Sequence, residues 1–121
     1  MIFRIIAGLM AALLAYAAVL NFNDPDPVRW VAIYGVACLI SILAAATGAV
    51  PIAAPAAIAI VALVWGATLA TRVPNMDAYT HMFDEWEMKS PQIEEAREAC
   101  GLFIVGVWMA AVAAVLWRGA R

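Results

Sequence analysis

Long uncharged apolar stretches alternate along the chain with short segments that hold almost all of the charged residues. Residues 5–23, 30–71 and 99–117 contain no Asp, Glu, Lys or Arg. A helix needs about 20 apolar residues to cross the roughly 30 Å of hydrocarbon in a bilayer. The first and last stretches therefore each predict one membrane span, and the middle stretch, which is about twice as long, predicts two.

These stretches favour helices over the strands of a membrane barrel, because they lack the alternation of polar and apolar residues that barrel strands show. We expect an all-α, integral-membrane four-helix bundle that forms a single transmembrane domain over residues 1–121. Small residues late in the first stretch resemble a signal-peptide cleavage site, but we expect a retained anchor, since removal would leave an odd number of helices. The predicted spans are 2–22, 28–46, 52–71 and 92–117.

Prolines next to short polar residues mark the predicted helix ends. In Asp24-Pro25-Asp26-Pro27, each proline fixes φ and disfavours the α conformation of the residue before it, so the first helix stops and the second begins. Asp26 suits the N-cap of the second span, with Pro27 at its first helical position. Residues 90–91, Ser-Pro, repeat this signal before the last span.

Residues 72–98 form the only sizeable segment that we expect outside the membrane. Within it, aromatic and methionine side chains recur at helical spacing, while acidic residues and the single histidine occupy the opposite side. This pattern predicts a short amphipathic helix over about 76–89 that lies along the bilayer interface, between the third and fourth spans.

Composition and charge agree with a membrane protein and indicate how the charged residues divide between the two sides of the membrane. The chain is 67% hydrophobic and 13% charged, which excludes an ordinary soluble domain, and its net charge of −2 indicates no nucleic-acid partner. With four spans, all 9 Asp and Glu residues lie on one face, and the other face holds only Arg4, Arg118 and Arg121. An acidic interfacial helix would be repelled by an anionic cytoplasmic leaflet. We therefore expect a bacterial inner-membrane protein with both termini cytoplasmic and the acidic face outside.

Small residues four positions apart occur in every predicted span. In lipid, such pairs let helix backbones approach closely, so they favour a compact bundle and assembly with a second copy or another membrane protein. The two cysteines, Cys38 and Cys100, are expected to pack as small residues rather than to form a disulfide. The pairs are Gly8–Ala12, Ala37–Ser41, Ala53–Ala57, Gly66–Ala70 and Gly106–Ala110.

Polar residues close to the hydrocarbon boundary form two clusters, one before the second span and one at the start of the fourth. Polar groups at such places usually face the bundle interior or a wet cavity and indicate a functional site. If the clusters form one site, Arg29 or Arg97 should lie within salt-bridge reach of Asp24 or Asp26, because unpaired carboxylates near hydrocarbon are costly. The candidate residues are Asn23, Asp24, Asp26, Arg29, Glu94, Glu95, Arg97 and Glu98.

The same two clusters carry a family resemblance. "NDPDP" followed by Trp30 and Tyr34, together with "EEAREACGL" at the start of the last span, resembles the transmembrane protein 220 family of small four-helix membrane proteins. The resemblance covers nearly the whole chain and implies the four-helix fold, but it implies no activity. It also implies that Asn23, Asp24, Pro25, Asp26, Trp30, Glu94, Glu95, Arg97, Glu98 and Gly101 belong to the family pattern.

Three functions remain open from the sequence, and a structural role is preferred. In that role the protein is a membrane scaffold or interaction subunit, whose acids cap helices and pair across an interface. The first alternative is binding or transport of a divalent cation, for which the oxygen-rich cluster and one imidazole favour zinc, manganese or iron. The ligands would come from Asp24, Asp26, His81, Glu85, Glu95 and Glu98, with Glu94 beside them.

The second alternative is an interfacial membrane enzyme. Glu95 or Glu98 would act as a general base near a metal ion or near Arg97. The chain has no Ser-His or Cys-His arrangement, no glycine-rich phosphate loop and no HExxH motif, so the sequence selects no reaction.

Overall fold

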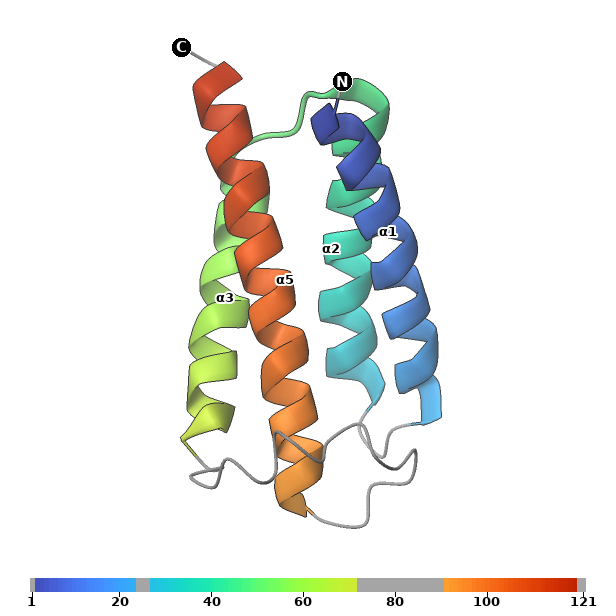
Figure 1. Cartoon of the computed structure of the whole chain (residues 1–121), viewed down its shortest axis with the longest axis vertical. Coiled ribbons are helices and arrows are strands. Elements are labelled where there is room, and N and C mark those ends of the chain that lie inside the picture. Colours follow the sequence, from blue (N-terminus) through green and yellow to red (C-terminus); the bar gives the residue numbers. More distant parts are fainter. Residues whose placement is uncertain (1, 24–26, 72–90, 120–121) are drawn as a thin grey trace.

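The computed structural model describes residues 2–23, 27–71 and 91–119, and the side chains of 2–22, 27–71 and 97–119. These residues form the helices α1 (Ile2–Leu20), α2 (Pro27–Thr47), α3 (Ala53–Ala70) and α5 (Pro91–Gly119), and a 3₁₀ turn, η1 (Asn21–Asn23), continues α1 (Figure 1). All four α-helices of the described part are long and apolar enough to cross a membrane, and that part contains no strand. The prediction of an all-α four-helix membrane bundle is confirmed. The predicted interfacial helix over 76–89 lies outside the described residues.

Proline and glycine mark several of the helix ends. Both α2 and α5 begin at a proline, where the missing amide proton costs no intrahelical hydrogen bond. Gly48 follows α2 with a φ of 68°, in the left-handed region, and its N–H donates to the Ala44 carbonyl at 3.0 Å. Glycine therefore ends α2, and the short link through Pro51 leads directly into α3.

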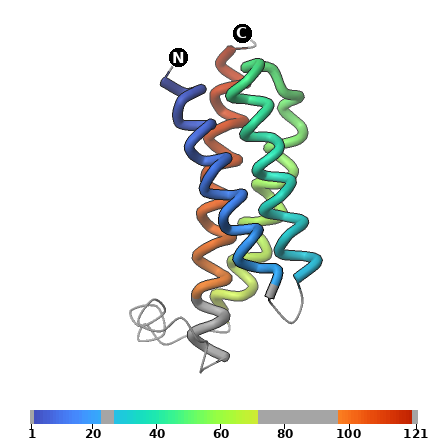
Figure 2. Tube along the Cα trace, turned by 90° about the vertical axis from the view of Figure 1, so that its right-hand side faces the viewer, coloured from blue at the N-terminus to red at the C-terminus, as the bar shows by residue number. Residues whose placement is uncertain are grey.

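The helices form two antiparallel pairs. α1 packs along α2, and α3 packs along α5, whereas contact between the pairs is much sparser (Figures 1 and 2). The start of α1, the link between α2 and α3, and the end of α5 lie together at one end of the bundle, which we call the terminal end. The other ends of the four helices lie at the opposite end, which we call the acidic end because the sequence places its carboxylates in the segments that leave the helices there.

Small residues let the backbones approach within each pair. A Cβ atom added to Gly66 of α3 would lie 3.2 Å from Cβ of Leu102 in α5, and one added to Gly106 of α5 would lie 2.5 Å from Cδ2 of Leu63. In the other pair, the Cys38 thiol donates to the Ala11 carbonyl at 3.3 Å. Both Cys38 and Cys100 are free thiols, as the sequence predicted.

Large side chains join one pair to the other. The indole N–H of Trp108 in α5 donates to the hydroxyl oxygen of Ser41 in α2 at 2.8 Å, and that hydroxyl donates to the Ala37 carbonyl at 2.8 Å. Phe3 of α1 stacks on Trp108, with ring centroids 6.1 Å apart. Trp108 therefore links three helices through one polar and one aromatic contact.

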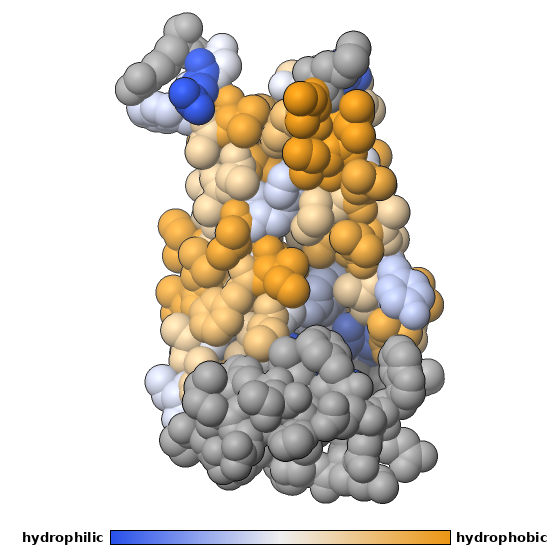
Figure 3. All heavy atoms as spheres, in the orientation of Figure 1, coloured by the Kyte–Doolittle hydropathy of each residue, from blue (hydrophilic) through white to orange (hydrophobic). Residues whose placement is uncertain are grey.

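The described residues on the face seen in Figure 3 are mostly apolar, as lipid contact requires. Leucine, isoleucine and valine side chains are exposed on all four helices. The small-residue pairs divide between inside and outside. Ala37 and Ser41 are fully buried, whereas Gly8 and Ala12 face outward on α1, as Ala53 and Ala57 do on α3.

Candidate functional site

The acidic end is the place where the sequence predicted a polar site. α1 and α3 end there, and α2 and α5 begin there (Figure 1). Of the eight candidate residues, the structure describes the side chains of Arg29, Arg97 and Glu98. The side chains of the other candidates, and of the proposed metal ligands outside this set, lie outside the described part: Asn23, Asp24, Asp26, His81, Glu85, Glu94 and Glu95. The salt bridge from an arginine to Asp24 or Asp26 stays a prediction.

Arg29 lies beside two stacked tryptophans at this end. The Trp30 and Trp65 rings are stacked with centroids 4.6 Å apart and an interplanar angle of 22°. The Arg29 guanidinium carbon lies 5.4 Å from one ring centroid and 5.6 Å from the other, within range of a cation–π interaction. Trp30 is only 1% exposed, so the stack connects α2 to α3 inside the bundle while Arg29 remains at its surface.

Tyr34 connects α2 to the beginning of α5. It lies one helical turn after Trp30 and is buried, and its hydroxyl lies so close to Gly101 that a Cβ atom there would overlap it. Glu98 lies three residues before Gly101 on the same side of α5. The two segments that carry the polar clusters therefore meet at the level of Tyr34 and Gly101.

At this end of the bundle, charged side chains lie around a group of packed aromatic side chains. Among the described residues, no three carboxylate, imidazole or thiol groups come together as a metal site would require. Arg29, Arg97 and Glu98 all make interactions with other groups, so none of these charges is isolated. The described residues can hold helix ends together and present charge to the headgroup region.

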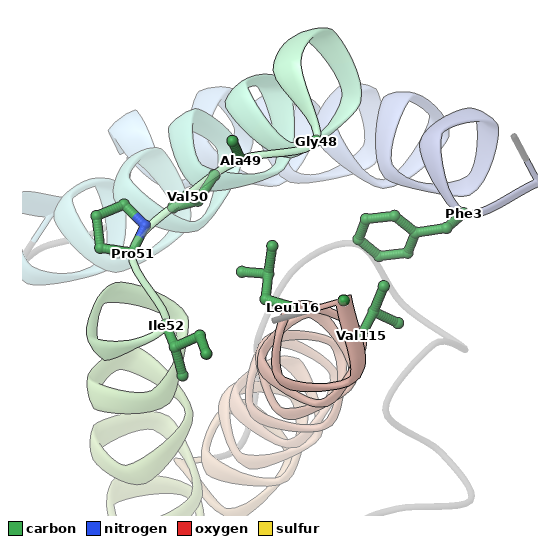
Figure 4. A pocket seen from close by; sticks show the side chains of 9 residues that line it. Phe3, Gly48, Ala49, Val50, Pro51, Ile52, Val115 and Leu116 are labelled. Atoms are coloured by element: carbon green, nitrogen blue, oxygen red, sulfur yellow. The ribbon is translucent and has the colours of Figure 1, made fainter. Parts of the chain in front are cut away.

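Two features of the structure were missed by sequence reasoning. Trp65 was not singled out, although a tryptophan in the last turns of a span is a typical interface residue. The second is an apolar pocket of about 590 Å³ at the terminal end (Figure 4). The uncharged link around Gly48 gave no chemical signal of it. Its lining consists of Phe3, Gly48, Ala49, Val50, Pro51, Ile52, Val115, Leu116 and Gly119.

Comparison with known proteins agrees with the resemblance seen in the two polar clusters. No solved structure matches the chain. A family model described as "Transmembrane family 220, helix" matches residues 13–114. Because the match covers most of the chain and includes both polar clusters, this protein belongs to the transmembrane 220 family.

Proposed function

We propose that this protein is a membrane scaffold or interaction subunit that binds another transmembrane helix on the outer face of α1. The observation that carries the proposal is an open notch at Gly8. Gly8 is exposed, a Cβ atom added there would meet nothing within 4 Å, and Ala12, one turn later, is also exposed.

The contrast with the other glycines of the bundle supports this role. The space beside Gly66 and Gly106 is filled by side chains of the neighbouring helix, so at these two positions glycine marks a close helix contact. Gly8 has the same spacing to a small residue, but its notch is bordered by the exposed side chains of Leu9 and Leu13. A second helix that packed into this notch would gain the van der Waals contacts that drive association in lipid.

The acidic end supplies a second element for recognition. All of the carboxylates lie between Asp24 and Glu98 in the sequence, in or beside the segments that leave the helices at that end. We place this face outside a bacterial inner membrane and both termini in the cytoplasm, because an acidic interfacial segment would be repelled by the anionic inner leaflet. A partner with basic residues near its own membrane boundary would be favoured there.

The test is the variant Gly8→Ile, which fills the notch and whose Cβ atom would meet nothing within 4 Å. We expect the variant to keep the thermal stability of the monomer in detergent but to lose association about tenfold, or about 1.4 kcal/mol. Association is measured by energy transfer between labelled copies in liposomes, and by recovery of cross-linked membrane partners.

Gly35→Ile is the matched control. Gly35 on α2 also has nothing within 4 Å of an added Cβ atom, but no small residue lies four positions after it. The control variant should associate like the unmodified protein. Equal association of the Gly8→Ile protein and the unmodified protein would show that α1 is not the interface.

We keep cation binding as a second candidate, because Tyr34 of α2 meets Gly101 of α5 about two to three turns after the starts of these helices. Asp24 and Asp26 precede the first of these helices, and Glu94 and Glu95 lie in the first two turns of the second. Metal analysis of the purified protein should then find zinc, manganese or iron, and Glu98→Gln should lose it while Glu87→Gln keeps it. A metal-free protein after incubation with each ion would contradict this candidate.

A further inference from the structure

The apolar pocket lies between the two helix pairs at the terminal end, away from the acidic end (Figure 4). Phe3 of α1 forms one side, the link residues Val50, Pro51 and Ile52 form another, and Val115 and Leu116 of α5 face them. Its volume of about 590 Å³ lies within the range of roughly 300–1,000 Å³ that is typical of small-ligand sites.

Contacts between the pairs close the bundle next to this pocket. Phe3 lines the pocket and stacks on Trp108, which in turn donates its N–H to Ser41. Trp108 precedes the lining residue Val115 by about two helical turns along α5. The crevice between the pairs is therefore filled at Trp108 and widens toward the terminal end.

All of the described charged side chains at the terminal end are positive. Arg4 follows Phe3, and its guanidinium donates to the Ala45 and Ala46 carbonyls at 2.6 Å each, at the end of α2. Arg118 is exposed, lies three residues after Val115 and precedes Gly119, which lines the pocket. The sequence has no Asp or Glu before residue 24 or after residue 98. The two described charged side chains at the terminal end, Arg4 and Arg118, are therefore both cationic.

We infer that this pocket holds an acyl chain of an anionic phospholipid, with Arg118 at the lipid phosphate. The lining side chains offer no polar group that would select a polar ligand, so a hydrocarbon chain is the occupant they suit. Arg118 immediately precedes the lining residue Gly119, and a guanidinium suits a phosphate in geometry and charge. Arg4 is already bonded to the end of α2, so the headgroup contact is assigned to Arg118.

Native mass spectrometry of the full chain in mild detergent tests this assignment. Phosphatidylglycerol and phosphatidylcholine with identical acyl chains are added in equal amounts. We expect one bound phosphatidylglycerol, retained about fivefold over phosphatidylcholine, which is the factor expected from one basic residue at an anionic headgroup. Equal retention of the two lipids would overturn the inference of an anionic ligand.

Two pairs of variants locate the bound lipid. Ala49→Trp puts an indole into the pocket from an exposed link position, and Ala67→Trp adds the same group to an exposed position of α3 away from it. The first variant should lose the bound lipid and the second should keep it. Retention of the lipid by the Ala49→Trp protein, or its loss from both, would overturn the location.

The headgroup contact is tested by charge. Arg118→Gln should reduce the fivefold preference to about equality, whereas Arg118→Lys should keep most of it, because a lysine also attracts a phosphate. An unchanged preference in the Arg118→Gln protein would show that another group binds the headgroup and would overturn the role of Arg118.

Discussion

Inside a helix pair the backbones lie close together, whereas the two pairs meet through long side chains. α3 and α5 approach each other at Gly66 and Gly106, where a neighbouring side chain fills the space of the missing Cβ atom. The pairs are joined instead by Trp108 on Ser41 and by the Trp30–Trp65 stack. In lipid, where burial of apolar surface drives helices together only weakly, shape and hydrogen bonds must hold both kinds of interface.

This difference determines where the bundle has room. At Gly66 and Gly106, a side chain of the neighbouring helix occupies the space between α3 and α5. Contacts made by single large side chains are separated along the helices, and the pocket near Phe3 lies beyond the last of them. Adding atoms should therefore destabilise the interface within a pair. Shortening a side chain should destabilise the interface between the pairs.

The largest effect is expected from Gly106→Leu, which adds atoms within the α3/α5 pair. An added Cβ atom would already lie 2.5 Å from Cδ2 of Leu63, and the larger leucine side chain requires Leu63 or the two helices to shift. We expect the free energy of unfolding to fall by about 3 kcal/mol, at the upper end of overpacking costs. Thermal or denaturant unfolding in detergent measures this, with Gly8→Leu as the control that keeps full stability. Equal stability of the two variants would contradict the close-packed pair.

Gly101→Ala tests the contact between Gly101 of α5 and a side chain of the other helix pair, that of Tyr34 in α2. The new methyl group would overlap the Tyr34 hydroxyl, and we expect a loss of about 2 kcal/mol in unfolding free energy. Adding Tyr34→Phe removes the hydroxyl and should recover much of that loss. If the double variant is no more stable than Gly101→Ala alone, the two residues do not meet as described.

The number and nature of the helices could be predicted from the sequence, because the length of an uncharged stretch determines whether it can cross a bilayer. The pairing of the helices could not be predicted. Ala37–Ser41 is buried and Gly8–Ala12 is exposed, yet both are pairs of small residues in apolar stretches. In lipid the outer face of a helix is as apolar as the inner face, so periodicity does not separate them.

Only the charged residues of the candidate site could be predicted from the sequence. Arg29, Arg97 and Glu98 stand out because charged residues are rare in this chain, and the structure brings their helices to one end. The partner of Trp30 could not be found in this way. Trp65 lies 35 positions later in the sequence, and no spacing rule relates two aromatic residues on different helices.

Ser41→Ala tests the polar contact between the pairs and should have a smaller effect. The variant leaves the Trp108 N–H without its acceptor at 2.8 Å, and hydrogen bonds between membrane helices contribute about 0.6 kcal/mol on average. Since the indole is partly buried, we expect a loss of about 1 kcal/mol in unfolding free energy. The Trp108→Phe variant in a double-mutant cycle with Ser41→Ala isolates the bond, and a coupling energy of zero would show that it does not form.

The smallest effect is expected from the loss of Arg4, which makes a polar contact between two helices, α1 and α2, that already pack closely. Arg4 of α1 donates to the Ala45 and Ala46 carbonyls at the exposed end of α2, where a positive charge also suits the helix dipole. Solvent screens this contact, so Arg4→Gln should lower the unfolding free energy by only about 0.5 kcal/mol, and added salt should reduce the difference. Unfolding in detergent at low and high salt measures both, with Arg4→Lys as the charge-preserving control. A loss as large as that from Gly106→Leu would mean that charge, rather than close backbone packing, holds α1 to α2.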